Sequence, residues 1–163
     1  MNSLLEDVSK SGDINTERIN VAILDSTYLR SDLSLNDEMI SKLETEWNVE
    51  LPKDLISDFN SKNRLKSKIL DKFESYFEYQ LFSSKEYSEI IESANSWQII
   101  EEQYPDIKTI LSFSRVGLNS DENKALLFVR TNCGPLCGAT YYLLFSKSDS
   151  KWKLEQEYQV RIS

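Results

Sequence analysis

Histidine is absent from this chain of 163 residues. Histidine is the side chain that most often serves as a general base near neutral pH, and it is the commonest metal ligand. Its absence excludes Ser-His-Asp triads, Cys-His pairs and histidine-ligated zinc sites. A hydrolase built from this chain could instead use carboxylates or serines.

Long apolar runs are missing as well. No stretch approaches the roughly 20 apolar residues of a membrane-spanning helix, so we expect no membrane insertion. The first residues have neither the basic start nor the apolar core of a secretory signal. That opening fits either a cytosolic chain or a trimmed, exported one.

Basic side chains are outnumbered, with 19 Lys and Arg against 27 Asp and Glu, for a net charge of −8. Residues 1–114 carry 12 basic and 22 acidic side chains (−10), whereas residues 115–163 carry 7 and 5 (+2). Because an acidic body repels phosphate groups, we expect no nucleic-acid partner. The charge fits a basic protein partner, or solubility alone, which is the commoner reason for an acidic surface.

The chain has only two cysteines, and both lie in the segment "NCGPLCG" at residues 132–138. This segment is similar to the redox motif CGPC with one leucine inserted. We therefore single it out as the candidate site, either as a disulfide or as a functional loop. Its residues are Cys133, Gly134, Pro135, Leu136, Cys137 and Gly138.

A hairpin is the simplest interpretation of this segment. If its arms are 125–131 and 139–145, a three-residue tip at 134–136 leaves Cys133 and Cys137 facing each other. Opposed residues in an antiparallel pair lie about 4.5 to 5.5 Å apart, within reach of a disulfide. Such a bridge would close a loop of about five residues and contribute roughly 2 kcal/mol. Unbridged thiols that simply pack remain an alternative.

Redox and metal roles are less favoured for these cysteines. A thioredoxin-like pair needs a cysteine at a helix N-terminus with its partner three residues on. Here the spacing is one residue longer, and a strand-like run comes after Cys137. A closed zinc site needs four ligands, and the chain offers two cysteines without histidine. We therefore expect neither a metal nor a cofactor.

Helical patterns dominate the first two thirds of the chain. Capping residues and apolar spacing predict helices over 17–30, 37–47 and a short stretch after Pro52. Residues 84–105 also have a helical pattern, with a break near Ser93 to Ser96. Residues 76–82 are rich in aromatic side chains and favour a strand.

Four strand-like runs come after Pro105, at 107–118, 124–131, 139–147 and 151–162, joined by short polar turns. These links predict an antiparallel meander. The fold class is therefore α+β, with N-terminal helices packed on a C-terminal four-stranded antiparallel meander. We expect a flexible arm at 1–15 and one α+β domain at 16–163.

Other side chains with catalytic potential are better explained as structural. Ser112, Ser114 and Arg115 lie on an alternating strand and are expected on its solvent face. The acid pairs are expected in solvent and the aromatic residues mostly in the core. The acid pairs are Glu44/Glu46, Glu101/Glu102 and Glu155/Glu157.

The second half resembles an uncharacterised family of small bacterial proteins. The resemblance rests on "SWQIIEEQYP", "ILSFSRVGLN", "KALLFV", "CGPLCGATYYLLF", "KWKL" and a final "RIS", over about the last 70 residues. Leu118 stands where the pattern has an aromatic residue, and Ala139-Thr140 where it has a small residue and glycine. The resemblance implies a shared fold and no catalytic residue. It tilts the expectation towards the cell envelope or periplasm and towards a bridge between the cysteines.

The function we expect is non-enzymatic binding of a protein or ligand through the sheet or the cysteine-loop end. The alternatives are a small hydrolase that uses carboxylates or serines, and a thiol redox protein. The sequence contains no catalytic constellation that would favour either one.

Overall fold

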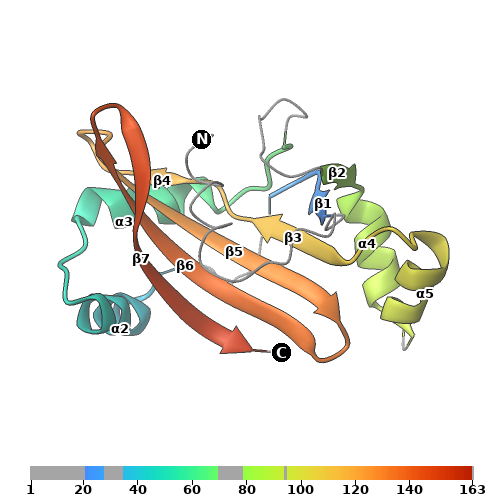
Figure 1. The fold of residues 1–163 in the computed structure, drawn as a ribbon. Helices are drawn as coiled ribbons and strands as arrows, with labels where there is room; N and C mark the ends of the chain where they lie inside the picture. Colours follow the sequence, from blue (N-terminus) through green and yellow to red (C-terminus); the bar gives the residue numbers. More distant parts are fainter. Residues whose placement is uncertain (1–20, 28–34, 70–78, 94, 163) are drawn as a thin grey trace.

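The computed structural model describes residues 21–27, 35–69, 79–93 and 95–162. Within these residues, four helices accompany one seven-stranded sheet (Figure 1). The helices are α2 (Asp37–Trp47), α3 (Lys53–Lys62), α4 (Ser84–Ile91) and α5 (Ser96–Gln103). The strands are β1 (Val21–Leu24), β2 (Tyr79–Phe82), β3 (Thr109–Phe113), β4 (Gly117–Leu118), β5 (Lys124–Gly134), β6 (Cys137–Ser148) and β7 (Lys151–Ile162).

The sheet is mixed, with strand order β2-β1-β3-β5-β6-β7 and β4 paired to β5. β1 runs parallel to both β2 and β3, and the remaining pairs are antiparallel. The structure is α+β, but the predicted four-stranded antiparallel meander is wrong. Parallel neighbours need long crossover connections, and the two helix pairs form part of them. Along the chain, α2 and α3 come between β1 and β2, and α4 and α5 come between β2 and β3.

The predicted helix at 17–30 is also wrong where the structure describes it. Residues 21–24 form β1, and all four are buried. A run of four apolar residues is compatible with a helix or a buried strand, and here its position between two parallel neighbours decides for the strand. The rest of that predicted helix within 17–20 and 28–30, and the predicted arm at 1–15, lie outside the described residues.

The other predicted helices are confirmed. α2 spans the predicted residues, and the Asn36 side chain caps it by accepting the Met39 amide at 2.9 Å. α3 begins directly after Pro52. The helical pattern at 84–105 divides into α4 and α5, with the interruption at the predicted place.

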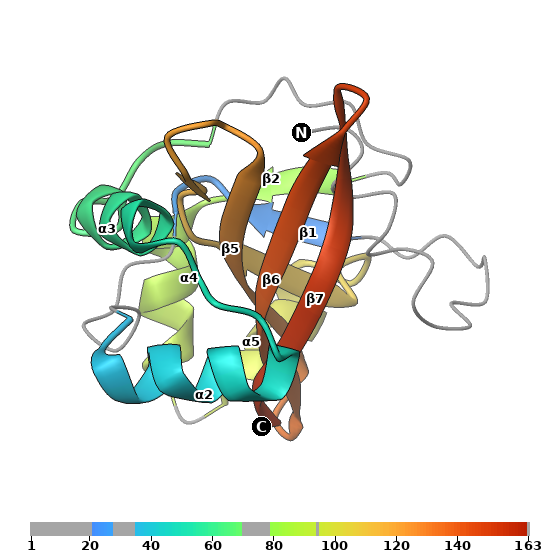
Figure 2. The same ribbon diagram turned by 90° about the vertical axis from the view of Figure 1, so that its left-hand side faces the viewer.

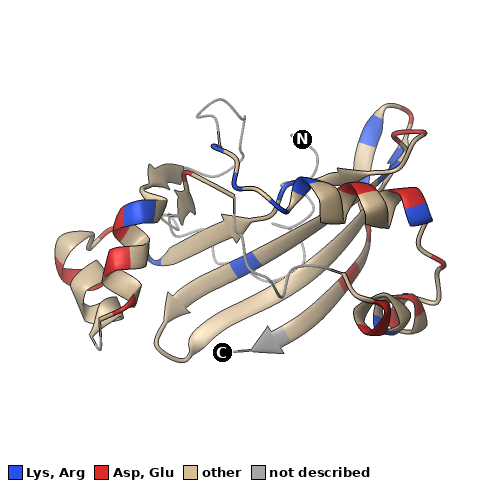
Figure 3. Ribbon diagram, turned by 180° about the vertical axis from the view of Figure 1, so that it is seen from behind, with Lys and Arg blue, Asp and Glu red and all other residues tan. Residues whose placement is uncertain are grey.

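Both helix pairs pack on the same face of the sheet, at opposite ends of it (Figures 1 and 3). α2 and α3 cover Phe128 and Tyr142, and α2 lies beside β6 and β7 (Figure 2). α4 and α5 cover Ala22 and Ile110. Ile110 on β3 pairs with Asn132 on β5, and Asn132 and Phe128 point to the same face because they are four residues apart on one strand. Ala22 pairs with Ile110 in turn, so the residues covered by the two helix pairs lie on the same face of the sheet.

A bulge lets apolar side chains of β7 pack on both faces of the sheet. Phe145 pairs with Leu154 but Leu144 pairs with Gln156, which leaves Glu155 as the extra residue. Leu154 therefore packs with the cluster around Phe145, whereas Tyr158 packs with the helix-covered cluster. Leu154 and Tyr158, which are four residues apart, therefore lie on opposite faces of the sheet.

Gly117 gives a direct test of the contact between α3 and β4. A β-carbon at Gly117 would lie 2.5 Å from the Phe59 β-carbon and 2.8 Å from its α-carbon, too close to be accommodated without movement. We expect Gly117→Ala to lower the free energy of unfolding by about 1–3 kcal/mol, the usual cost of overpacking. Chemical denaturation measures it. Ser148→Ala, on the exposed end of β6, is the control and should change little.

Candidate functional site

The loop that joins β5 to β6 closes the hairpin formed by two long central strands of 11 and 12 residues. The ladder is regular up to Asn132, which pairs with Gly138, and then shifts so that Gly134 pairs with Cys137. Cys133 is the bulged residue. The predicted three-residue tip with directly opposed cysteines is therefore wrong, because only Pro135 and Leu136 lie in the turn.

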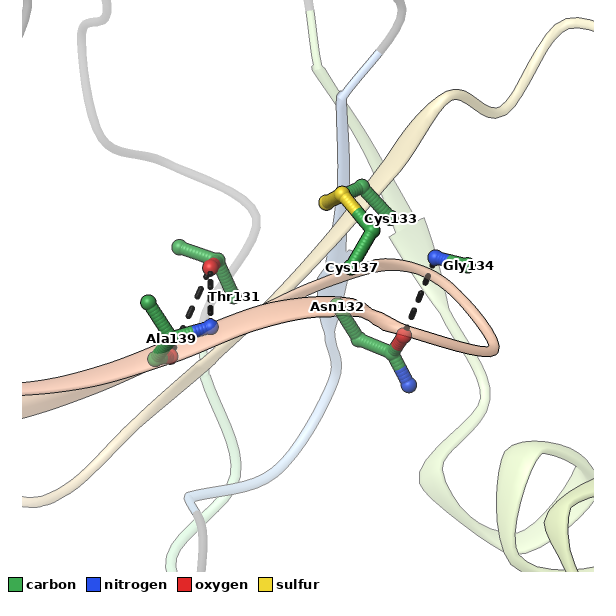
Figure 4. The surroundings of a disulfide bond; sticks show 6 residues. All are labelled: Thr131, Asn132, Cys133, Gly134, Cys137 and Ala139. Atoms are coloured by element: carbon green, nitrogen blue, oxygen red, sulfur yellow. Dashed lines mark hydrogen bonds between the residues drawn. A yellow bond between two sulfur atoms is a disulfide. The ribbon is translucent and has the colours of Figure 1, made fainter. Parts of the chain in front are cut away.

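Cys133 and Cys137 form a disulfide, with their α-carbons 5.0 Å apart (Figure 4). The bridge joins the bulged residue diagonally to the first residue of β6. A strand begins at Cys137, and the helix that a thioredoxin-like thiol needs is not at this position. The bridge therefore braces a turn.

Side-chain hydrogen bonds support the hairpin on both sides of the bridge. The Thr131 hydroxyl accepts the Ala139 amide at 3.0 Å, beneath the bridge. The Asn132 side chain accepts the Gly134 amide at 3.3 Å (Figure 4). Gly134 has φ +154°, in the range that favours glycine, which explains why this residue type stands at the entry to the turn.

The hairpin end is seated on helices α4 and α5. The Asn132 side-chain amide donates to the Tyr87 hydroxyl of α4 at 2.9 Å. A β-carbon built on Gly134 would lie 3.7 Å from the indole nitrogen of Trp97 on α5, which is ordinary contact. Neither partner carries a signal in the sequence, because Tyr87 lies 45 residues from Asn132 and only the fold brings them together.

Leu136 is presented to solvent at the tip. Its exposed fraction is 90%, against 73% for Leu65 and 40% for Ile91, the other exposed large hydrophobic residues that the structure describes. Pro135 beside it is also exposed. The bridge, the bulge and the contacts to α4 and α5 thus hold one apolar side chain outward on a braced turn. We name Pro135, Leu136 and Cys137 the hairpin tip.

The helices beside the hairpin tip are acidic. Residues 84–108 contain six Asp and Glu and two Lys, for a net charge of −4. Figure 3 shows several of these acidic residues, drawn in red, on the helices at one end of the sheet. The Tyr104 hydroxyl donates to the Glu86 carboxylate and joins the two helices, and this bond raises the pKa of Tyr104. The tip thus projects beside a surface of negative potential.

A hollow of about 500 Å³ lies at the carboxyl ends of β1 and β2. Four serines, three lysines and three acidic residues line it. The Asp25 carboxylate accepts the Ser84 amide at 2.9 Å, and the Ser26 hydroxyl donates to the Ser84 hydroxyl at 2.7 Å. Hydrogen bonds from Ser84 lower the pKa of Asp25, with a further contribution from the charge of Lys68.

This hollow is the arrangement closest to the alternative of a hydrolase built on serine and carboxylate. A general base works best when its pKa lies near the working pH. The lowered pKa of Asp25 moves it away from that range. Asp25 instead ties the end of β1 to the first turn of α4, where the carboxylate is stabilised by the helix N-terminus.

The structure gives the serines near Arg115 a role inside the fold. Ser112 and Ser114 are buried, so the predicted solvent face is wrong for them. The Ser114 hydroxyl accepts the Phe128 amide at 2.9 Å. The Asn63 side chain accepts the Arg115 amide at 2.7 Å and donates to its carbonyl at 2.9 Å. These contacts fix the bend between β3 and β4.

Members of the predicted acid pairs also have identifiable partners. Glu44 accepts the Leu51 amide at 2.8 Å, and Glu155 forms an ion pair with Lys124. Glu102 accepts from the Gln98 side chain at 2.9 Å. The contacts of Glu44 and Glu102 are local, whereas the ion pair of Glu155 joins β7 to β5 across β6. In the part of the chain that the structure describes, no group of three or more Cys, Asp or Glu is placed to hold a metal ion.

Comparison of the chain with protein-family models, curated proteins and solved structures found no match. The resemblance in the second half therefore stays a prediction. Among the helices in the described ranges, none has the length and apolar character needed to cross a membrane.

Serine is close to cysteine in size, so replacing both cysteines with serine removes the bridge and changes little else. We expect Cys133→Ser/Cys137→Ser to lower the free energy of unfolding by about 2 kcal/mol, because the bond closes a loop of only about five residues. Denaturant unfolding of the oxidised protein and the variant measures the difference. A loss above about 5 kcal/mol would contradict the interpretation of the bridge as a local brace.

The lowered pKa of Asp25 leads us to expect that the stability of the fold depends on pH. Its folded-state pKa is lowered from the usual 3.8, so its contribution is present above that value and is lost as the pH falls through the lowered pKa. Asp25→Asn should be less stable than the wild type at neutral pH, with the difference shrinking below about pH 4. Thermal melts between pH 7 and pH 2 measure it. Asp106→Asn, at an exposed turn, is the control.

Proposed function

We propose that this protein is a non-enzymatic binding domain that docks a basic protein surface through the hairpin tip. The observation that carries the proposal is the 90% exposed Leu136 on a turn braced by a disulfide. An isolated exposed leucine needs no explanation by itself. Here the leucine stands on a turn closed by a disulfide, and the end of the hairpin below it contacts α4 and α5, so that it is preorganised for recognition.

Rigidity is the first argument. Binding costs free energy when a loop has to become ordered, and a turn that is already fixed avoids much of that cost. The bridge and the hydrogen bond from Asn132 to Tyr87 hold the end of the hairpin before any partner arrives. A leucine displayed in this way suits a shallow apolar pocket on another protein.

Charge is the second argument and decides the kind of partner. The neighbouring residues 84–108 have a net charge of −4. Opposite charge across an interface steers encounter and rejects partners of the same sign. The fitting surface is therefore an apolar pocket with a basic rim, and association should slow as salt is raised.

The outer edge of β7 is a less suitable docking element. A long edge strand can pair with another chain, and bulges and charges are the usual protection against such pairing. β7 carries two register shifts. Its exposed positions include Lys151, Lys153 and Glu157. These features support docking at the hairpin tip over docking at this edge.

A photo-crosslinking amino acid at position 136 tests the proposal. In extract from the native host, we expect it to trap a protein with a basic surface, and trapping to fall as salt is raised. The control is the same amino acid at position 65, since Leu65 is also highly exposed but lies elsewhere.

Competition makes this experiment decisive. Excess unlabelled wild type or Leu65→Asp should suppress the product by more than about tenfold, whereas Leu136→Asp should leave it, because a carboxylate cannot enter an apolar pocket. Equal competition by Leu136→Asp would contradict docking through the tip. So would the same products from both crosslinking positions.

A further inference from the structure

We propose that the Cys133–Cys137 bridge is a redox switch that a dithiol reductant opens, and that opening it weakens docking through the hairpin tip. The proposal concerns regulation of the same site and rests on the proposed function for its consequence. It stands on three observations: the accessibility of the bridge, the local extent of its opening and the dependence of the tip on it.

One end of the bridge lies at an exposed residue. Cys137 is exposed, whereas Cys133 is half-buried. A thiolate of the reductant attacks the Cys137 sulfur, the bond between the cysteines breaks, and Cys133 leaves as a thiolate that takes up a proton. The second thiol of the reductant then displaces Cys137 from the mixed disulfide. Two electrons and two protons pass from the dithiol to the bridge. Exposed bridges are the ones that exchange readily.

Opening the bridge leaves the hairpin beneath it paired. Asn132 pairs with Gly138, and Thr131 pairs with Ala139 with an added hydrogen bond from the Ala139 amide to the Thr131 hydroxyl. The Asn132 side chain still donates to Tyr87 of α4. These contacts do not involve sulfur. Reduction therefore frees the tip while the sheet and the helices keep their places.

The tip depends on the bridge more than the rest of the hairpin does. Cys133 is a bulged residue outside the regular ladder, and Gly134, at a positive φ, has no β-carbon to restrict its backbone. Within the described residues, the side-chain hydrogen bond that remains at the turn joins Asn132 to the Gly134 amide at 3.3 Å. Without the bridge, Leu136 is no longer held in one position.

The chemical part is tested on the full chain without a partner. The protein is equilibrated with mixtures of reduced and oxidised dithiothreitol, free thiols are alkylated, and the modified fraction is measured by mass. We expect the bridge to open without denaturant and the far-ultraviolet circular dichroism to stay unchanged. Amide exchange at residues 134–138 should rise by about tenfold or more, with 125–130 unaffected.

Two outcomes of this measurement would overturn the switch. One is a bridge that stays closed in excess dithiothreitol under native conditions. The other is loss of the whole fold on reduction, since a switch must leave the domain intact. Cys133→Ala/Cys137→Ala is the control, because it should show the fast exchange of the open tip in every mixture.

The docking part uses the crosslinker at position 136 in oxidised and reduced protein. We expect the competed product to fall by about tenfold on reduction, because the tip must then become ordered at binding. Equal yields in both states would reject the switch and leave docking intact. If neither state gives a competed product, docking itself fails, and the exchange measurement still decides whether the bridge opens locally.

Discussion

The pairing of β5 with β6 is the interaction on which the rest of the structure depends. It extends from Lys124 opposite Ser146 to Gly134 opposite Cys137, and both strands bury consecutive residues on the two faces of the sheet. Helices α2 and α3 pack on one face of this strand pair, and β3 pairs with the edge of β5 that β6 leaves free. Because β5 has partners along both edges, its apolar run can be continuous where an exposed strand would alternate.

The end of this hairpin is also the element to which we assign recognition in the proposed function. Its regular ladder stops where the bulge at Cys133 begins, so the turn is free to take a shape that the sheet does not impose. The disulfide and the contact with Tyr87 replace the missing ladder. A rigid scaffold that ends in a braced, exposed turn is a frequent arrangement for recognition. In the function and the regulation that we propose, binding and its control by thiols share this one element.

The hollow beside Asp25 shows how polar clusters can serve the fold. Ser26, Ser84 and the Asp25 carboxylate hydrogen-bond to one another, and these bonds anchor the end of β1 to the first turn of α4, 59 residues further along the chain. The pairs formed by Asn63 with Arg115 and by Asp58 with Leu118 do the same for α3 and the β4 segment. Each replaces a lost ladder or helix hydrogen bond with a side chain, which lets short strands end without unsatisfied amides.

Local sequence determined the elements whose signals are local. The cap at Asn36, the Pro52 start and the break between α4 and α5 predicted three helical regions, and the strand-like run at 151–162 predicted β7. The absence of histidine determined which catalytic groups the chain lacks. Tertiary structure alone decided that residues 21–24 form a central parallel strand, because four apolar residues fit either state until neighbours bury both of their faces. It also decided that the cysteine loop meets Tyr87 and Trp97, since contacts between distant residues leave no periodic trace in one sequence.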